Sequence, residues 1–89
     1  MCEFKVSDKT VELLIKETLK YYEDEEKRLM ILEKLRKAGN DAMKIVQTYI
    51  DMGWDQISFE MLLDTLEIPL RDKVILFGIA EVKIDEWPT

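Results

Sequence analysis

The sequence predicts an all-α protein, a compact bundle of four to five short helices. Apolar residues recur at helical spacing along most of the chain. The joints between the predicted helices are about two to four residues long, and no repeat, low-complexity stretch or linker separates them. A chain of 89 residues is long enough for one domain and too short for two. We therefore expect residues 1–89 to form a single helical domain.

The first predicted helix begins near Ser7 or Asp8, either of which can cap its N-terminus. The acidic run 23–26 then interrupts the apolar pattern without a glycine or a proline. Either one helix continues to Ala38, or Asp24 caps a second helix; acidic side chains complement the dipole at a helix start and favour the break. Gly39 is the predicted C-cap. The apolar side of this stretch contains Val11, Leu14, Ile15, Leu19, Tyr22, Leu29, Leu32, Leu35 and Ala38.

Asp41 is the predicted N-cap of a third helix, which ends at Gly53. At the next junction Asp55 is the predicted N-cap, which places Trp54 and Phe59 at the spacing of a hydrophobic staple. The fourth helix stops before Pro69, because the residue before a proline is pushed out of the helical region. We expect this helix to bury Ile57, Phe59, Leu62, Leu63 and Leu66, and we expect Met30, Met43, Met52 and Met61 to fill the core.

The C-terminal segment allows two structures. Residues 74–77 are rich in strand formers, but Asp72 can cap a helix that runs past Gly78 to about Val82. A strand would need a partner, and the only candidate is the very short segment 4–6. Helix is therefore the favoured prediction for residues 72–84. Trp87 is either a plug on the core or a contact residue.

Composition argues for a binding protein rather than an enzyme. The chain has no histidine and one cysteine, which excludes an internal disulfide, the common zinc sites and histidine-dependent nucleophilic catalysis. The acidic run 23–26 lacks the spacing of a calcium loop, and Lys27 and Arg28 follow it at once. We interpret this run as a charged helix junction. We expect neither a metal ion nor another cofactor.

The chain also lacks the sequence features of a membrane or secreted protein. Its longest apolar run, residues 74–80, has seven residues, far fewer than the ~20 that span a bilayer. The N-terminus has no signal-peptide pattern, so we expect a cytoplasmic protein. The formal net charge of −6 argues against nucleic acid as a direct partner, because phosphate binding needs clustered Lys and Arg.

The negative charge is concentrated in the second half of the chain. Residues 1–40 hold nine acidic and nine basic side chains, whereas residues 41–89 hold ten acidic and four basic ones. Like charges one turn apart on a helix destabilise it slightly, so a fold that keeps them without nearby bases can use them to attract a basic partner. The alternative is a solvated face that aids solubility. The predicted partner-binding residues are Asp51, Trp54, Asp55, Glu60, Asp64 and Glu67, with Trp54 as an apolar anchor at the edge of the acidic surface.

Residues 49–70 resemble a pattern found in small immunity proteins of bacterial toxin systems, including contact-dependent growth inhibition and Maf-type cassettes. In that pattern a helix ends at a glycine followed by an aromatic or acidic residue, and the next helix closes on Ile-Pro-Leu. Here the matching residues are Gly53-Trp54, Phe59 to Leu62, Leu66 and Ile68-Pro69-Leu70. The sequence departs from the pattern at Ser58-Phe59 and in its tail.

The resemblance implies an immunity protein, or antitoxin, that binds a cognate toxin domain, frequently a basic nuclease, so that the toxin cannot reach its substrate. Two alternatives remain open. The first is a small helical regulator, encoded by a phage or a plasmid, that binds RNA polymerase or another host protein. The second is a helical homodimer, in which the five methionines and the exposed aromatic residues form an interface between identical copies.

Overall fold

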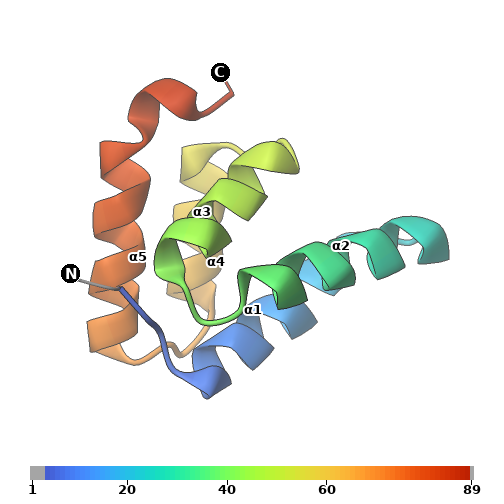
Figure 1. The fold of residues 1–89 in the computed structure, drawn as a ribbon, viewed down its shortest axis with the longest axis horizontal. Coiled ribbons are helices and arrows are strands. Elements are labelled where there is room, and N and C mark those ends of the chain that lie inside the picture. The colour runs from blue at the N-terminus through green and yellow to red at the C-terminus, as the bar shows by residue number, and fades with distance from the viewer. Residues whose placement is uncertain (1–3, 89) are drawn as a thin grey trace.

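Five α-helices and one short 3-10 helix follow one another in a computed structural model that describes residues 4–88. The prediction of an all-α bundle is confirmed (Figure 1). The radius of gyration is 12.1 Å, close to the value of about 12 Å typical of a folded domain of this length. The helices are α1 (Asp8–Leu19), α2 (Glu25–Ala38), α3 (Ala42–Asp51), α4 (Gln56–Thr65) and α5 (Leu70–Val82), and the 3-10 helix is η1 (Ile84–Glu86).

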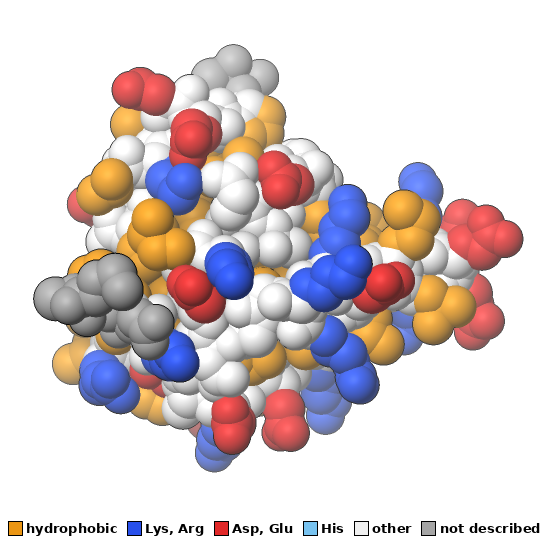
Figure 2. All heavy atoms as spheres, viewed as in Figure 1, with side chains coloured by type: hydrophobic (Ala, Val, Ile, Leu, Met, Phe, Trp, Pro, Cys, Tyr) orange, Lys and Arg blue, Asp and Glu red, His pale blue; other side chains and the backbone are white. Residues whose placement is uncertain are grey.

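The main packing partners of the helices are α1 with α2, α2 with α3, α3 with α5, and α5 with α4. Figure 1 shows α1 and α2 side by side as a helical hairpin that extends to the right, with α5 at the left of the molecule. Helix α3 packs between α2 and α5 and provides much of the core, and α4 lies behind α3 in this view and packs against α5. Lys and Arg side chains gather over α2 on the face that Figure 2 shows.

The stretch 9–38 forms two helices and not one. Residues 20–24 form the connection between α1 and α2. The Asp24 side chain caps α2 by accepting a hydrogen bond from the Glu26 backbone N–H at 3.0 Å. Gly39 ends α2 with a φ of 59°. The acidic run is therefore a helix junction whose caps were readable from the sequence.

The C-terminal segment is helical, as predicted, but Asp72 does not cap it. Helix α5 begins two residues earlier at Leu70, after Pro69, and Asp72 is a buried residue of its first turn. The extended segment 4–6 pairs instead with the α2–α3 junction. The Val6 backbone N–H donates to the Asn40 carbonyl at 2.9 Å, and the Ala42 backbone N–H donates to the Phe4 carbonyl at 2.8 Å. This pairing ties the start of the chain to α3.

Several residues expected in the core lie at the surface. Met30, Met43 and Met61 are exposed, whereas Met52 packs against the core as predicted. Ile57 is 72 % exposed, so its predicted burial is wrong. The reason is geometric: these helices carry apolar residues around more of their circumference than the bundle covers, and only one stripe of each faces the core. Among residues 4–88, no helix combines the length and apolar character needed to cross a membrane.

Candidate functional site

Helix α4 exposes apolar side chains at the centre of its outward side. Phe59, Leu62 and Leu63 are buried and fix which side of the helix faces the core. Ile57 and Met61 project from the opposite side, one turn apart, and are 72 % and 63 % exposed. The spacing of Gln56, Glu60, Asp64 and Glu67 in the sequence predicts one solvent-facing polar stripe on this helix. In the structure the outward side of α4 instead has an apolar centre.

Carboxylates lie along one flank of this apolar centre and at the two ends of the helix. Asp55 stands immediately before the helix, Asp64 is exposed in its last turn, and Glu67 is exposed just after it. Glu60 is half-buried at the margin of the helix. Four of the six predicted partner-binding residues thus lie along one helix and its ends. We call this surface the α4 face; it consists of Asp55, Ile57, Glu60, Met61, Asp64 and Glu67.

Asp55 is held in its charged form by its role as the N-cap of α4. Its Oδ1 accepts a hydrogen bond from the Ser58 backbone N–H at 2.6 Å. The hydrogen bonds from the backbone and the side chain of Ser58 lower the pKa of this carboxyl group. Asp55 is therefore a fixed negative charge at the start of the α4 face.

Asp64 is not free of nearby bases, contrary to the expectation for the acidic stripe. Its Oδ1 lies 2.7 Å from Nζ of Lys73 on α5, and the Asp64 side chain remains 62 % exposed. The Lys73 ammonium group also lies 5.6 Å from the centroid of the Phe77 ring. This ion pair joins α4 to α5 and neutralises part of the negative charge at one end of the α4 face.

Asp51 lies apart from the α4 face. Its Oδ1 accepts a hydrogen bond from Gln47 Nε2 at 3.0 Å, one turn back on α3. It lines a groove of about 320 Å³ between α2 and α3, together with Lys34, Lys37 and Lys44. The structure therefore places Asp51 among basic side chains and not beside Glu60 and Asp64.

Trp54 is half-buried and already has partners within the chain. Its Nε1–H donates to the Tyr22 hydroxyl at 2.9 Å, and its ring makes edge-to-face contacts with Tyr21 and Tyr49 at centroid distances of 5.4 and 5.2 Å. Tyr21 is the exposed member of this group, at 61 %. Trp54 thus fastens the α3–α4 turn to the end of α1, which limits its role as an anchor for another protein.

The predicted staple between Trp54 and Phe59 takes an indirect form. The caps and spacing are as expected, but Tyr49 lies between the two rings: it contacts Trp54 on one side and Phe59, at 4.8 Å, on the other. Phe59 in turn contacts Trp87, whose Nε1–H donates to the Ala80 carbonyl at 3.0 Å. Trp87 is buried and is the plug on the core.

Ile57 and Met61 are the residues of this face that sequence reasoning assigned to the core. Their i, i+4 spacing on the side opposite Leu62 and Leu63 was a usable signal, because a helix with apolar residues all round must cover or expose the second stripe. No family model, curated protein or solved structure matches this chain. The function proposed below therefore rests on the surface of the chain itself.

Proposed function

We propose that the chain is an immunity protein that binds a basic protein toxin through the α4 face. One observation supports this proposal most directly. Ile57 and Met61 are exposed side by side, with the carboxylates of Glu60 and Asp64 along one flank and Asp55 before the start of the helix. Apolar residues that exclude water at the centre of a patch, with charged groups at its rim, are the arrangement of a specific protein interface.

The two parts of the face have different tasks in the proposed complex. The apolar pair loses its contact with water and supplies affinity, which appears mainly as slow dissociation. The carboxylates attract a positively charged partner and orient it, which appears mainly as fast association that falls with added salt. A toxin domain that holds phosphates in a basic groove meets the second requirement, and seating the α4 face in that groove would keep the substrate out.

The proposed surface differs from the sequence prediction in its centre. We assign the main contacts to Ile57, Met61 and Glu60. Ile57 and Met61 are exposed, and Glu60 is half-exposed and makes no ion pair with another side chain of residues 4–88. Asp64 must share its charge with Lys73. Asp51, which faces the α2–α3 groove, and Trp54, which is bonded to Tyr22, are assigned outside the contact.

The first experiment is co-expression with the product of the neighbouring gene, scored for rescue of growth and for co-purification. The binding surface is then tested with Ile57→Ser and Glu60→Lys in the purified complex. We expect Ile57→Ser to raise Kd about tenfold or more through faster dissociation. We expect Glu60→Lys to slow association and to flatten the dependence of Kd on salt.

Glu12→Lys is the matched control, because it makes the same charge change at an exposed position of α1. It should leave dissociation unchanged and alter association less than Glu60→Lys. Equal effects of the two lysine variants would mean that net charge, not the α4 face, governs binding. Capture of RNA polymerase or another host protein without growth rescue would contradict the immunity function and favour a regulator.

A further inference from the structure

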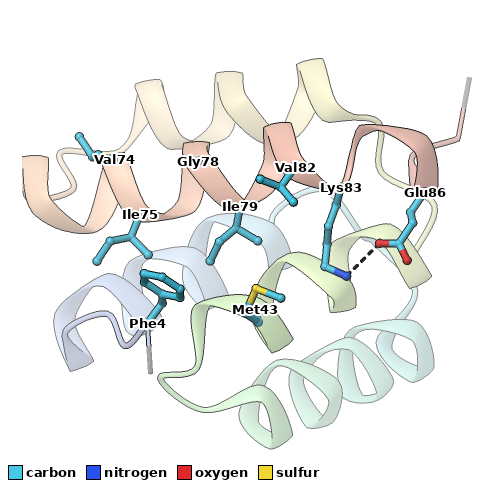
Figure 3. Close-up of a pocket in the computed structure, with 9 residues that line it drawn as sticks. All are labelled: Phe4, Met43, Val74, Ile75, Gly78, Ile79, Val82, Lys83 and Glu86. Carbon is cyan, nitrogen blue, oxygen red and sulfur yellow. Dashed lines mark hydrogen bonds and ion pairs between the residues drawn. The ribbon is translucent and has the colours of Figure 1, made fainter. Parts of the chain in front are cut away.

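A second exposed apolar surface lies on α5, away from the α4 face. Leu70, Val74 and Val82 are 74 %, 59 % and 83 % exposed, and with Gly78 they form a row at spacings of four residues along one side of the helix. Beside this row is a hollow of about 670 Å³, in which Ile75 and Ile79 of α5 face Phe4 and Met43 (Figure 3). A helix with apolar residues on both sides is typical of one that is covered on both sides.

The charges on this side of α5 are few and ordered. Arg71 stands near the N-terminal end of the exposed row and Glu81 near its C-terminal end; both are exposed. Neither makes an ion pair with another side chain of residues 4–88. Lys83 and Glu86, which also line the hollow, pair with each other at 2.8 Å. Apart from this ion pair, the exposed side of α5 has a positive end, an apolar middle and a negative end.

We propose that this side of α5 packs antiparallel against the same side of α5 in a second copy of the chain. A two-fold axis at the level of position 76 brings each residue of one copy opposite the residue of the other copy that lies equally far from position 76 in the other direction along the chain. Arg71 then faces Glu81 of the second copy, Leu70 faces Val82, and Val74 faces Gly78. Because the axis repeats every contact, the pairing forms two oppositely charged pairs and leaves no like charges facing each other.

Gly78 makes a close approach possible at the middle of the row. A Cβ atom added there would have no heavy atom of the chain within 4 Å. The space beside Gly78 therefore admits the Val74 side chain of the second copy, and the exposed Phe4 and Met43 extend the apolar contact past the helix. Contacts of this kind between small and branched residues bring helices to short separation.

A second copy is the occupant that the charges specify. An unrelated apolar helix would fill the hollow equally well, but it would also need an acidic residue opposite Arg71 and a basic residue opposite Glu81. Helix α5 of a second copy already has these two residues at the required positions. Antiparallel pairing also sets the N-terminal end of each helix dipole beside the C-terminal end of the other. The contact is one helix wide, so its buried area should be at the small end of the range for specific interfaces, and we expect a weak dimer.

Sedimentation velocity of the whole chain, from about 5 to 500 μM, tests the pairing. The mean mass should rise with concentration from the 10.6 kDa of one chain towards twice that value. Arg71→Glu should weaken dimerisation about tenfold or more, since it sets carboxylates opposite each other. Glu81→Arg should do the same, and the double variant Arg71→Glu/Glu81→Arg should restore dimerisation, because the reversed charges face each other again.

Gly78→Leu tests the apolar middle independently of charge. The added side chain has open space in the single chain, and it occupies the place assigned to Val74 of the second copy, so the fold should persist while the dimer is lost. Far-ultraviolet circular dichroism verifies that each variant is folded. A chain that stays at the monomer mass up to the highest concentration overturns the proposal. So does a dimer that is insensitive to Arg71→Glu and Gly78→Leu, or a double variant that fails to recover dimerisation.

Discussion

The hydroxyl group of Thr10 on α1 donates a hydrogen bond to Asp72 on α5 at 2.6 Å, across a separation of 62 residues in the chain. The same carboxylate oxygen, Oδ2, also accepts hydrogen bonds from Ser7 Oγ at 2.8 Å and from the Ser7 backbone N–H at 3.1 Å. Ser7 is the N-cap of α1. Asp72 therefore holds in place the residue that begins α1, and it joins the first helix of the bundle to the last.

Replacing Asp72 with alanine should destabilise the fold strongly. Asp72 and Thr10 are buried, so the variant leaves the Thr10 hydroxyl and the Ser7 donors without their acceptor. We expect a loss of about 3 kcal/mol in the free energy of unfolding, the scale of losing charged hydrogen bonds inside a protein. Urea denaturation measures it. The exposed Asp85→Ala should change stability by less than about 0.5 kcal/mol, and an equal loss in the two variants would contradict the role given to Asp72.

The stability that Asp72 provides should disappear in acid. Burial raises the pKa of this carboxyl group. The hydrogen bonds from Thr10 and Ser7, with the nearby Arg71, lower the pKa by more than burial raises it, so the folded pKa lies below the usual 3.8. Between the folded and unfolded pKa values the unfolded chain binds more protons, so stability falls as pH falls. The contribution is complete above about pH 4 and is lost as pH drops through the folded value. The stability gap between the wild type and Asp72→Asn, measured by urea denaturation from neutral to acid pH, should therefore narrow below about pH 4; a constant gap would contradict the lowered pKa.

Asp72 also shows which kind of contact the sequence does not predict. Asp24, Asp41 and Asp55 cap the helices that local sequence assigned to them, because a cap and its N–H donors lie within three residues. Asp72 looked like another cap, yet its partners come from the start of the chain. Similarly, the outward position of Ile57 depends on which side of α4 the other helices cover. Helix limits follow from local chemistry, whereas the candidate surface follows from packing between distant segments.

Thr18 and Tyr49 form a buried hydroxyl pair between α1 and α3, and it should behave as a unit. Tyr49→Phe leaves the Thr18 hydroxyl without this partner, and Thr18→Val leaves the Tyr49 hydroxyl without it, so each should cost about 1–3 kcal/mol in the free energy of unfolding. The double variant replaces both with apolar groups and should cost less than the sum of the single variants. Simple additivity in this double-mutant cycle would show that the two hydroxyls do not interact.

The two sides of α4 should differ sharply in what substitution does to stability. Phe59 has no exposed surface and contacts the Tyr49 and Trp87 rings, so Phe59→Ala should cost about 3–5 kcal/mol. Ile57 is 72 % exposed, and Ile57→Ala should stay within about 0.5 kcal/mol of the wild type. Thermal unfolding followed by circular dichroism distinguishes them. A large loss from Ile57→Ala would place that side chain in the core and remove it from the proposed binding face.

Two glycines should respond in opposite directions to the same substitution. Gly78 lies inside α5, and a Cβ atom there meets nothing within 4 Å; alanine should therefore stabilise the single chain by about 0.5–1 kcal/mol, since it reduces the freedom of the unfolded chain and favours helix. Gly53 has a φ of 87°, which an L-residue adopts only with strain, so Gly53→Ala should destabilise by about 1 kcal/mol or more. Denaturation at low micromolar concentration keeps association on α5 from contributing to either value. Destabilisation by Gly78→Ala under those conditions would mean that other atoms of the same chain occupy the space beside Gly78. It would also contradict the α5 pairing, which requires that space to be free for Val74 of the second copy.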